Sequence, residues 1–184
     1  LGNNAIALLK VRRRHARAVP AFPVTPLAGE SPHLFEQHPG EHRLNEKDSL
    51  ALTRSATMVS STDESKALGR RRGPMIILSA SGMATGGRIL HHLAHYLGDH
   101  RNLVILTGFQ AQGTRGASLA DGAGTIRIHG REIDVKAEVA QLKGASAHAD
   151  APQLIAWLRT MPGVPGQVYI VHGERKASDE LRKR

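Results

Sequence analysis

The feature that most constrains this fold is an ordered series of apolar runs, a glycine-rich turn and a helical repeat, which begins at residue 74. Residues 75–80 (MIILSA) are almost continuously apolar and are bounded by turn residues, which is typical of a buried strand in a parallel sheet. The turn 81–88 leads into a segment whose apolar residues recur at helical spacing. A second apolar run, LVILTG at 103–108, follows. This order predicts an α/β fold in which both runs belong to one parallel sheet with right-handed crossovers.

The segments on either side of this series predict further elements. Residues 1–17 are expected to form the last part of a helix. Residues 19–24 (VPAFPV) are expected to form a short strand, and its prolines favour a position at the edge of a sheet. A helix with an asparagine cap is expected at about 45–55. The polar and then basic stretch 60–74 is expected to be a connection, and a short helix is expected at about 114–121.

The last third of the chain changes its hydrophobic period. Apolar and polar residues alternate across 125–142, which predicts a β-hairpin that turns at Gly130. A polar loop, a helix at about 151–159 and a strand at 167–171 are expected next, and the chain ends inside a further predicted helix.

The charge and composition of the chain narrow its class and partners. The net charge of +9 favours a polyanionic partner, although many small basic proteins carry such a charge only for solubility. The absence of cysteine excludes a disulfide framework and a thiolate metal site. No apolar run approaches the roughly 20 residues of a membrane span, and the N-terminal charge pattern is the reverse of a secretory signal. We therefore expect a cytoplasmic protein with no membrane contact.

Five short motifs occur in a fixed order along the chain. They are DESKAL (63–68), SGMATGGRILHHL (81–93), GFQAQGT (108–114), SAHAD (146–150) and VHGE (171–174). Each is a weak signal by itself. Their order and spacing together resemble the β-CASP branch of the metallo-β-lactamase superfamily, which contains RNA-processing ribonucleases. The resemblance extends from about residue 19 to the C-terminus.

This resemblance implies a domain organisation. In that family a metallo-β-lactamase domain holds two zinc ions, a β-CASP domain is inserted into it as a lid, and RNA lies between them. Residues 1–128 then correspond to a partial β-CASP α/β domain with a parallel sheet and an exit hairpin. Residues 129–184 correspond to the RNA-specificity segment, which re-enters the αββα metallo-β-lactamase fold at about residue 146. The complete enzyme is also expected to be able to form a homodimer.

Two histidines are candidate site residues. From the residues alone, His172 at the end of a predicted strand is best interpreted as a core or capping histidine, and the alternative for His148 is an exposed loop histidine. The resemblance implies instead that His172 is a zinc ligand, with Glu174 orienting its imidazole. It also implies that His148 is a catalytic residue beside the scissile phosphate, either as proton donor or as imidazolium.

The glycine-rich turn is the candidate phosphate site. Backbone N–H groups at the start of a helix form an anion site. Gly82, Gly86 and Gly87 allow a phosphate to approach closely, Ser81 offers a hydroxyl donor, and Arg88 can pair with a phosphate. The alternative is an ordinary turn before a helix. The chain has neither the dinucleotide fingerprint nor a P-loop lysine.

Other charged and histidine-containing segments are weaker candidates. His91 and His95 have the spacing of zinc ligands on a helix, but no HExxH pattern accompanies them, so a polar helix face near RNA is the preferred interpretation. The basic clusters 10–17, 70–72 and 176–184 can contact phosphates or can simply be solvated. Because Phe109 is the one aromatic residue in a candidate binding loop, RNA contacts are expected to be electrostatic and weakly sequence-specific.

The sequence departs from the family pattern in two places. The HxHxDH cluster that supplies most zinc ligands is absent, and Val24 stands where the family has an acidic residue before a Ser-Pro pair. We therefore expect the C-terminal part of a zinc-dependent RNA phosphodiesterase, inactive without its metallo-β-lactamase half. The alternative is a non-catalytic RNA-binding remnant of the same family. An unrelated basic α/β protein is a third interpretation, which the five ordered motifs disfavour.

Overall fold

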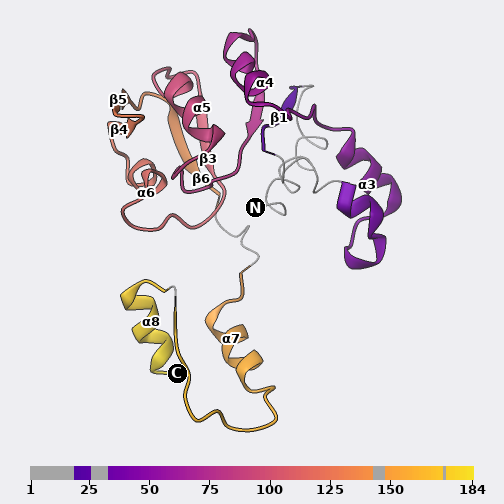
Figure 1. The fold of residues 1–184 in the computed structure, drawn as a ribbon, viewed down its shortest axis with the longest axis vertical. Coiled ribbons are helices and arrows are strands. Elements are labelled where there is room, and N and C mark those ends of the chain that lie inside the picture. The colour runs from indigo at the N-terminus through magenta and orange to yellow at the C-terminus, as the bar shows by residue number, and fades with distance from the viewer. Residues whose placement is uncertain (1–18, 26–32, 143–147, 172) are drawn as a thin grey trace. The chain divides into compact units, whose positions relative to one another are not determined.

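The computed structural model describes residues 19–25, 33–142, 148–171 and 173–184 (Figure 1). The chain divides into two compact units, Leu1–Ser146 and Ala147–Arg184, and each is described by itself. The helix expected at 1–17 lies outside the described residues. In the described part of the chain, no helix is long and apolar enough to cross a membrane.

Two short strands form the first parallel pair of the larger unit. Strand β1 (Ala21–Pro23) pairs with β2 (Ile76–Leu78), and Phe22 lies opposite Ile77. Both strands were predicted, and Pro23 is accommodated because β1 pairs with β2 alone among the described strands. The pair buries the apolar side chains of β1 and Leu78 at one end of the unit.

A second parallel pair corrects the predicted sheet. Strand β3 (Leu103–Leu106) pairs with β6 (Glu138–Gln141), and no hydrogen bond joins β3 to β2 among the described residues. The prediction that both apolar runs share one sheet was therefore wrong, although each run is a parallel strand. The expectation of a buried β3 was also wrong for one face, because Leu103 and Ile105 are 53% and 45% exposed.

The observed hairpin is shorter than the alternating sequence pattern at 125–142 that predicted it. Strands β4 (Thr125–Ile128) and β5 (Arg131–Asp134) are antiparallel and joined through His129 and Gly130. Both turn residues have positive φ, 49° and 77°, which is the backbone that a two-residue hairpin turn requires. The alternating pattern continues into β6, which leaves the hairpin and pairs with β3.

Short helices connect these strands. Residues 33–37 are helical, and the 3₁₀ turn η1 spans Pro39–Glu41. Helix α3 (Glu46–Thr53) was predicted, and α4 (Thr62–Ala67) followed by the 3₁₀ turn η2 (Leu68–Arg70) lies in the expected connection. The α4 helix begins at a capping box between Ser61 and Glu64. Helices α5 (Arg88–Tyr96) and α6 (Arg115–Ala120) confirm the helices predicted after the glycine-rich turn and at about 114–121.

The main core of the larger unit lies beneath α5. Leu97 is fully buried immediately after the helix, and Leu90 and Leu93 project from the same face of α5. They pack with Leu106 of β3, with Leu119 of α6 and with buried side chains of the hairpin. The carbonyl of Leu97 also accepts the backbone N–H groups of Lys136 and Ala137, at 2.8 and 2.9 Å. This core supports the turn that precedes α5.

The smaller unit contains helices α7 (Ala151–Leu158) and α8 (Arg175–Arg182). The strand predicted at 167–171 is absent, because these residues form no ladder with any described strand. Their side chains are largely solvent-exposed, as are Trp157 (66%) and Val164 (98%). An isolated extended segment has no partner for its backbone groups, so an apolar sequence alone does not make it a strand.

Candidate nucleic-acid interface

The glycine-rich turn 81–87 joins the end of β2 to the start of α5. Ser81 and Ala84 have positive φ values of 63° and 53°, a conformation that residues other than glycine seldom adopt. Gly87 (φ 76°) is the N-cap of α5, and no side chain caps the helix there. The local backbone is therefore strained where the sequence predicted a phosphate site.

The hydroxyl of Ser81 is the centre of this turn. Its Oγ accepts the backbone N–H groups of Thr85 and Gly86, each at 3.2 Å, and forms a hydrogen bond with the Thr85 hydroxyl at 3.0 Å. The space beside Gly86 and Gly87 is open, because an added Cβ would meet nothing within 4 Å. The Thr85 and Gly86 N–H groups are thus occupied by Ser81, while the backbone beside Gly86 and Gly87 is open to an approaching group. Phosphate binding by this turn stays a prediction.

Arg88 fixes the turn against the first parallel pair. Its Nη1 donates to the carbonyls of Val24 (2.6 Å) and Val59 (3.2 Å), and its Nη2 donates to the carbonyl of Ser60 (2.8 Å). These bonds hold the guanidinium beside the end of β1. Bidentate pairing with a phosphate stays a prediction for this residue.

Val24 lies inside the protein at the end of β1. Its side chain is fully buried and packs with Phe22, Val59 and Leu68. The position that resembles the family's acidic residue therefore holds an apolar side chain in an apolar environment. A carboxylate in this apolar environment would be unfavourable without a cationic partner.

The candidate residues of the smaller unit lie at its helix starts. His148 is exposed and precedes Asp150, which caps α7 and forms a capping box with Gln153. Glu174 is exposed at the N-cap position of α8. His172 lies outside the described residues, so its implied role as a zinc ligand stays a prediction.

The histidines of α5 face different surroundings. His91 lies against His129 of the hairpin turn, with ring centroids 5.0 Å apart, whereas His95 meets the edge of Tyr96 at 4.6 Å. Neither pairing brings together the three or four ligands of a zinc site. The preferred interpretation of a polar helix face is consistent with this geometry.

His92 forms a buried polar contact that the sequence did not reveal. Its Nε2 lies 2.9 Å from the hydroxyl of Ser65, within the DESKAL motif, and both residues are buried. Burial, and to a smaller extent the charges of His91 and His95, lowers the pKa of His92. The pair joins α4 to α5, so the neutral imidazole stabilises the frame behind the glycine-rich turn.

We expect this contact to make folding sensitive to acid. Because the pKa of His92 is lowered in the folded state, the unfolded chain binds a proton that the folded chain does not. The stability from the neutral imidazole is therefore complete above the unfolded value of 6.5 and is lost as the pH falls from there toward the lower folded pKa. Urea unfolding between about pH 7.5 and 5 should show the loss. A His92→Gln variant should show a flatter dependence, and an equally steep one would contradict the assignment.

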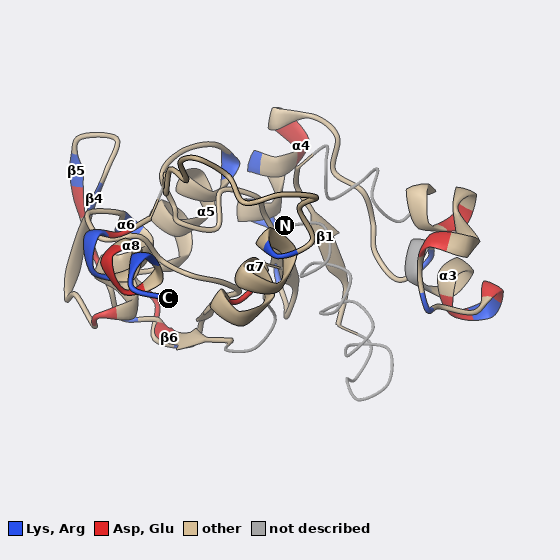
Figure 2. Cartoon of the chain, turned by 90° about the horizontal axis from the view of Figure 1, so that it is seen from below, with Lys and Arg blue, Asp and Glu red and all other residues tan. Residues whose placement is uncertain are grey.

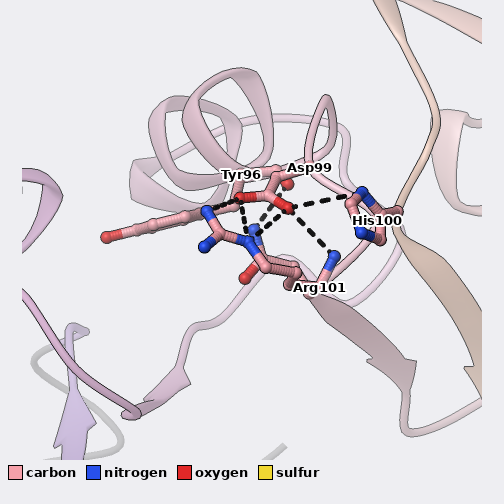
Figure 3. Close-up of polar contacts among 5 residues, drawn as sticks. Tyr96, Asp99, His100 and Arg101 are labelled. Atoms are coloured by element: carbon pink, nitrogen blue, oxygen red, sulfur yellow. Dashed lines mark hydrogen bonds and ion pairs between the residues drawn. The ribbon is translucent and has the colours of Figure 1, made fainter.

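Ion pairs reduce the number of cations that remain for RNA. After α5, Asp99 lies between Arg101 and His100 (Figure 3). Its carboxylate accepts a hydrogen bond from the Arg101 guanidinium at 2.6 Å. Hydrogen bonds from the Arg101 side chain and backbone hold the pKa of Asp99 well below its usual range. Along α8, acidic residues stand between basic ones (Figure 2). Lys183, the C-cap of α8, pairs with Glu180 at 2.7 Å. Arg71 lies over the Phe22 ring at 5.1 Å.

The segment 108–116 contains contacts to the turn that the sequence did not predict. Gln110 and Arg115 both donate to carbonyls of residues 82–85, and Gly116 donates its backbone N–H there. The GFQAQGT motif was the available signal, but its residues suggested no chemistry without the neighbouring turn.

Two family models match consecutive parts of the chain. The Beta-Casp domain matches residues 5–119. The Zn-dependent metallo-hydrolase RNA specificity domain matches residues 132–184.

Several relatives share this sequence over part of their length. The chain is 37% identical over 179 residues to Ribonuclease TTHA0252 from Thermus thermophilus, which covers 92% of this chain and 40% of the relative. It is 32% identical over 148 residues to Transcription termination factor FttA from Methanocaldococcus jannaschii, covering 78% and 23%. It is 34% identical over 113 residues to Integrator complex subunit 11 from Gallus gallus, covering 61% and 18%. The chain thus spans less than half the length of each relative.

Proposed function

Because this chain belongs to the β-CASP family of metal-dependent RNA-processing nucleases, we propose that it is the C-terminal part of a zinc-dependent RNA phosphodiesterase. The observation that carries the proposal is the succession of the two family models, β-CASP at 5–119 and RNA specificity at 132–184. We also propose that the chain does not cleave RNA alone. The HxHxDH cluster that the family resemblance requires is absent from its 184 residues.

The described residues do not by themselves fit a zinc site. Zinc needs three or four nitrogen, sulfur or oxygen ligands at one point, and no group of three or more histidine and carboxylate side chains gathers among the described residues. In a complete enzyme, zinc would lower the pKa of a bound water and so supply the nucleophile. Ligands would then come largely from a metallo-hydrolase half, with His172 as this chain's proposed contribution.

The residues of this chain are proposed to bind and orient RNA. N–H groups of the turn 81–87 would hold a backbone phosphate, and the Ser81 hydroxyl could donate to one of its oxygens. His148, exposed before α7, would give a proton to the leaving oxygen or bind the phosphate as imidazolium. The proposed partners are therefore RNA and the metallo-hydrolase half. A homodimer of the complete enzyme and a cytoplasmic location also remain proposals.

We expect weak RNA binding that depends steeply on salt. If three or four phosphates are contacted, log K should fall against log salt with a slope of roughly −2 to −3, at about 0.7 per contact for a single strand. Fluorescence anisotropy with a labelled single-stranded RNA at several salt concentrations measures this slope. Affinity that does not change between low and physiological salt would contradict an electrostatic interface.

The alternative function is a non-catalytic RNA-binding module of the same family. Val24 favours it, because a buried valine stands at the position that resembles the family's acidic residue. The same RNA preparation, incubated with the chain and added zinc, tests the absence of cleavage. If a supplied metallo-hydrolase half then produces cleavage, the phosphodiesterase proposal is supported. If the assembled protein binds RNA without cutting it, the alternative holds.

A further inference from the structure

Three carbonyl groups of the glycine-rich turn point to one neighbouring segment. The Gly82 carbonyl accepts the side-chain amide of Gln110 at 3.0 Å, and the Met83 carbonyl accepts the Gly116 backbone N–H at 2.9 Å. The Ala84 carbonyl accepts the Arg115 guanidinium at 3.3 Å. All three donors lie between Gln110 and the first turn of α6, which lies beside β4 and β6 (Figure 1). The turn is therefore held along one side by donors that follow β3.

Gln110 is fitted closely between two backbone segments. Its Nε2 donates to Gly108 (3.1 Å) as well as to Gly82, so the amide bridges the two loops. Its Oε1 is buried and has no hydrogen-bond partner in the described part of the protein. Gly116 provides the necessary space, because an added methyl group would overlap this oxygen and lie 3.0 Å from the Met83 Cα. A buried acceptor without a partner is unfavourable, so packing alone does not explain a glutamine here.

The bond to Gly82 determines the direction of an N–H group. The described peptide bonds include no cis bond, and in a trans peptide the C=O and N–H groups point in opposite directions. Holding the Gly82 carbonyl toward Gln110 therefore turns the Met83 N–H away from the 108–116 segment. The next two peptides follow the same pattern, because the Ala84 and Thr85 N–H groups bind the carbonyl and hydroxyl oxygens of Ser81.

We propose that Gln110 is a positioning residue for RNA binding, which orients the Gly82–Met83 peptide so that its N–H group and the Ser81 hydroxyl can meet a backbone phosphate together. This inference rests on the proposed function, since it assigns the phosphate to this turn. Gln110 itself does not contact the RNA. Its action passes through the Gly82 carbonyl, and the absence of a side chain at Gly116 is what allows the amide to reach that carbonyl.

The test compares two glutamines that share one acceptor. In Gln110→Met the side chain keeps its length but loses both donors and the unpartnered oxygen. Gln141 also donates to the Gly108 carbonyl, at 3.3 Å, but makes no bond to the turn. Gln141→Met is therefore the matched control. Both proteins are examined as the full 184-residue chain by urea unfolding, by amide hydrogen exchange of residues 82–87 and by binding to a single-stranded oligouridine.

Gln110→Met should unfold at the same urea concentration as the unaltered chain or slightly above it, while the amides of the turn exchange faster. Its RNA dissociation constant should rise about tenfold, the value of one hydrogen bond to a charged group. Gln141→Met should change neither the exchange nor the RNA affinity. Unchanged exchange and affinity in Gln110→Met would overturn the inference, as would equal effects in both variants. If the unaltered chain binds no RNA, the proposed function fails and the RNA role of Gln110 fails with it. The exchange data would still decide whether Gln110 orients the turn.

Discussion

Replacing Leu97 by alanine should lower the free energy of unfolding by about 2–5 kcal/mol. Leu97 is fully buried in the core beneath α5, and its removal leaves a cavity between the helix, β3 and the hairpin. This decrease in stability has two parts: the free energy of transferring the side chain out of water is lost, and the cavity that remains adds a further unfavourable term. Urea unfolding followed by circular dichroism measures it, with an unchanged slope showing that the unfolded state is not affected.

Leu103→Ala provides the matched control for this prediction. The side chain removed is the same, but Leu103 is 53% exposed on the uncovered face of β3. Its loss should cost about 1 kcal/mol or less. If the two variants were destabilised equally, the face of β3 that carries Leu103 would be covered in solution, and the core would extend beyond the cluster described above.

Replacing Val24 by aspartate should destabilise the larger unit by about 3 kcal/mol or more, because an uncompensated charge would be buried. Val24 is fully buried among Phe22, Val59 and Leu68. Burial raises the pKa of a carboxyl group, so the loss should be larger at neutral pH than near pH 5. Urea unfolding at the two pH values measures both the loss and its direction.

Val24→Asn separates the charge from the change of shape. The amide has nearly the size of the carboxylate, and burying it without a hydrogen bond costs about 1–3 kcal/mol. The difference between the two variants is then the cost of the charge. A Val24→Asp protein as stable as the unaltered chain would contradict this expectation, because it would show that the new carboxylate is compensated.

The sequence predicted the elements whose signals are local. Continuous apolar runs predicted the strands β2 and β3, and a 3.6-residue period predicted the helix α5 after the glycine-rich turn. Both signals depend only on residues that are neighbours in the sequence. The hairpin turn at Gly130 follows from a backbone conformation that glycine adopts without strain. The family, too, was identified from sequence, because motif order does not depend on packing.

The tertiary structure decided which segments are neighbours. An apolar run does not specify its partner strand, so β2 and β3 were wrongly assigned to one sheet, and 167–171 was predicted as a strand although no described strand pairs with it. The Ser65–His92 contact and the Gln110–Gly82 bond join residues 27 and 28 positions apart. Neither has a periodic signal, since a side-chain amide or imidazole finds its acceptor only after the helices and turns have packed. The sequence by itself therefore determined the family and the secondary structure around the glycine-rich turn. Packing determined the partner of each strand and the contacts that orient the turn.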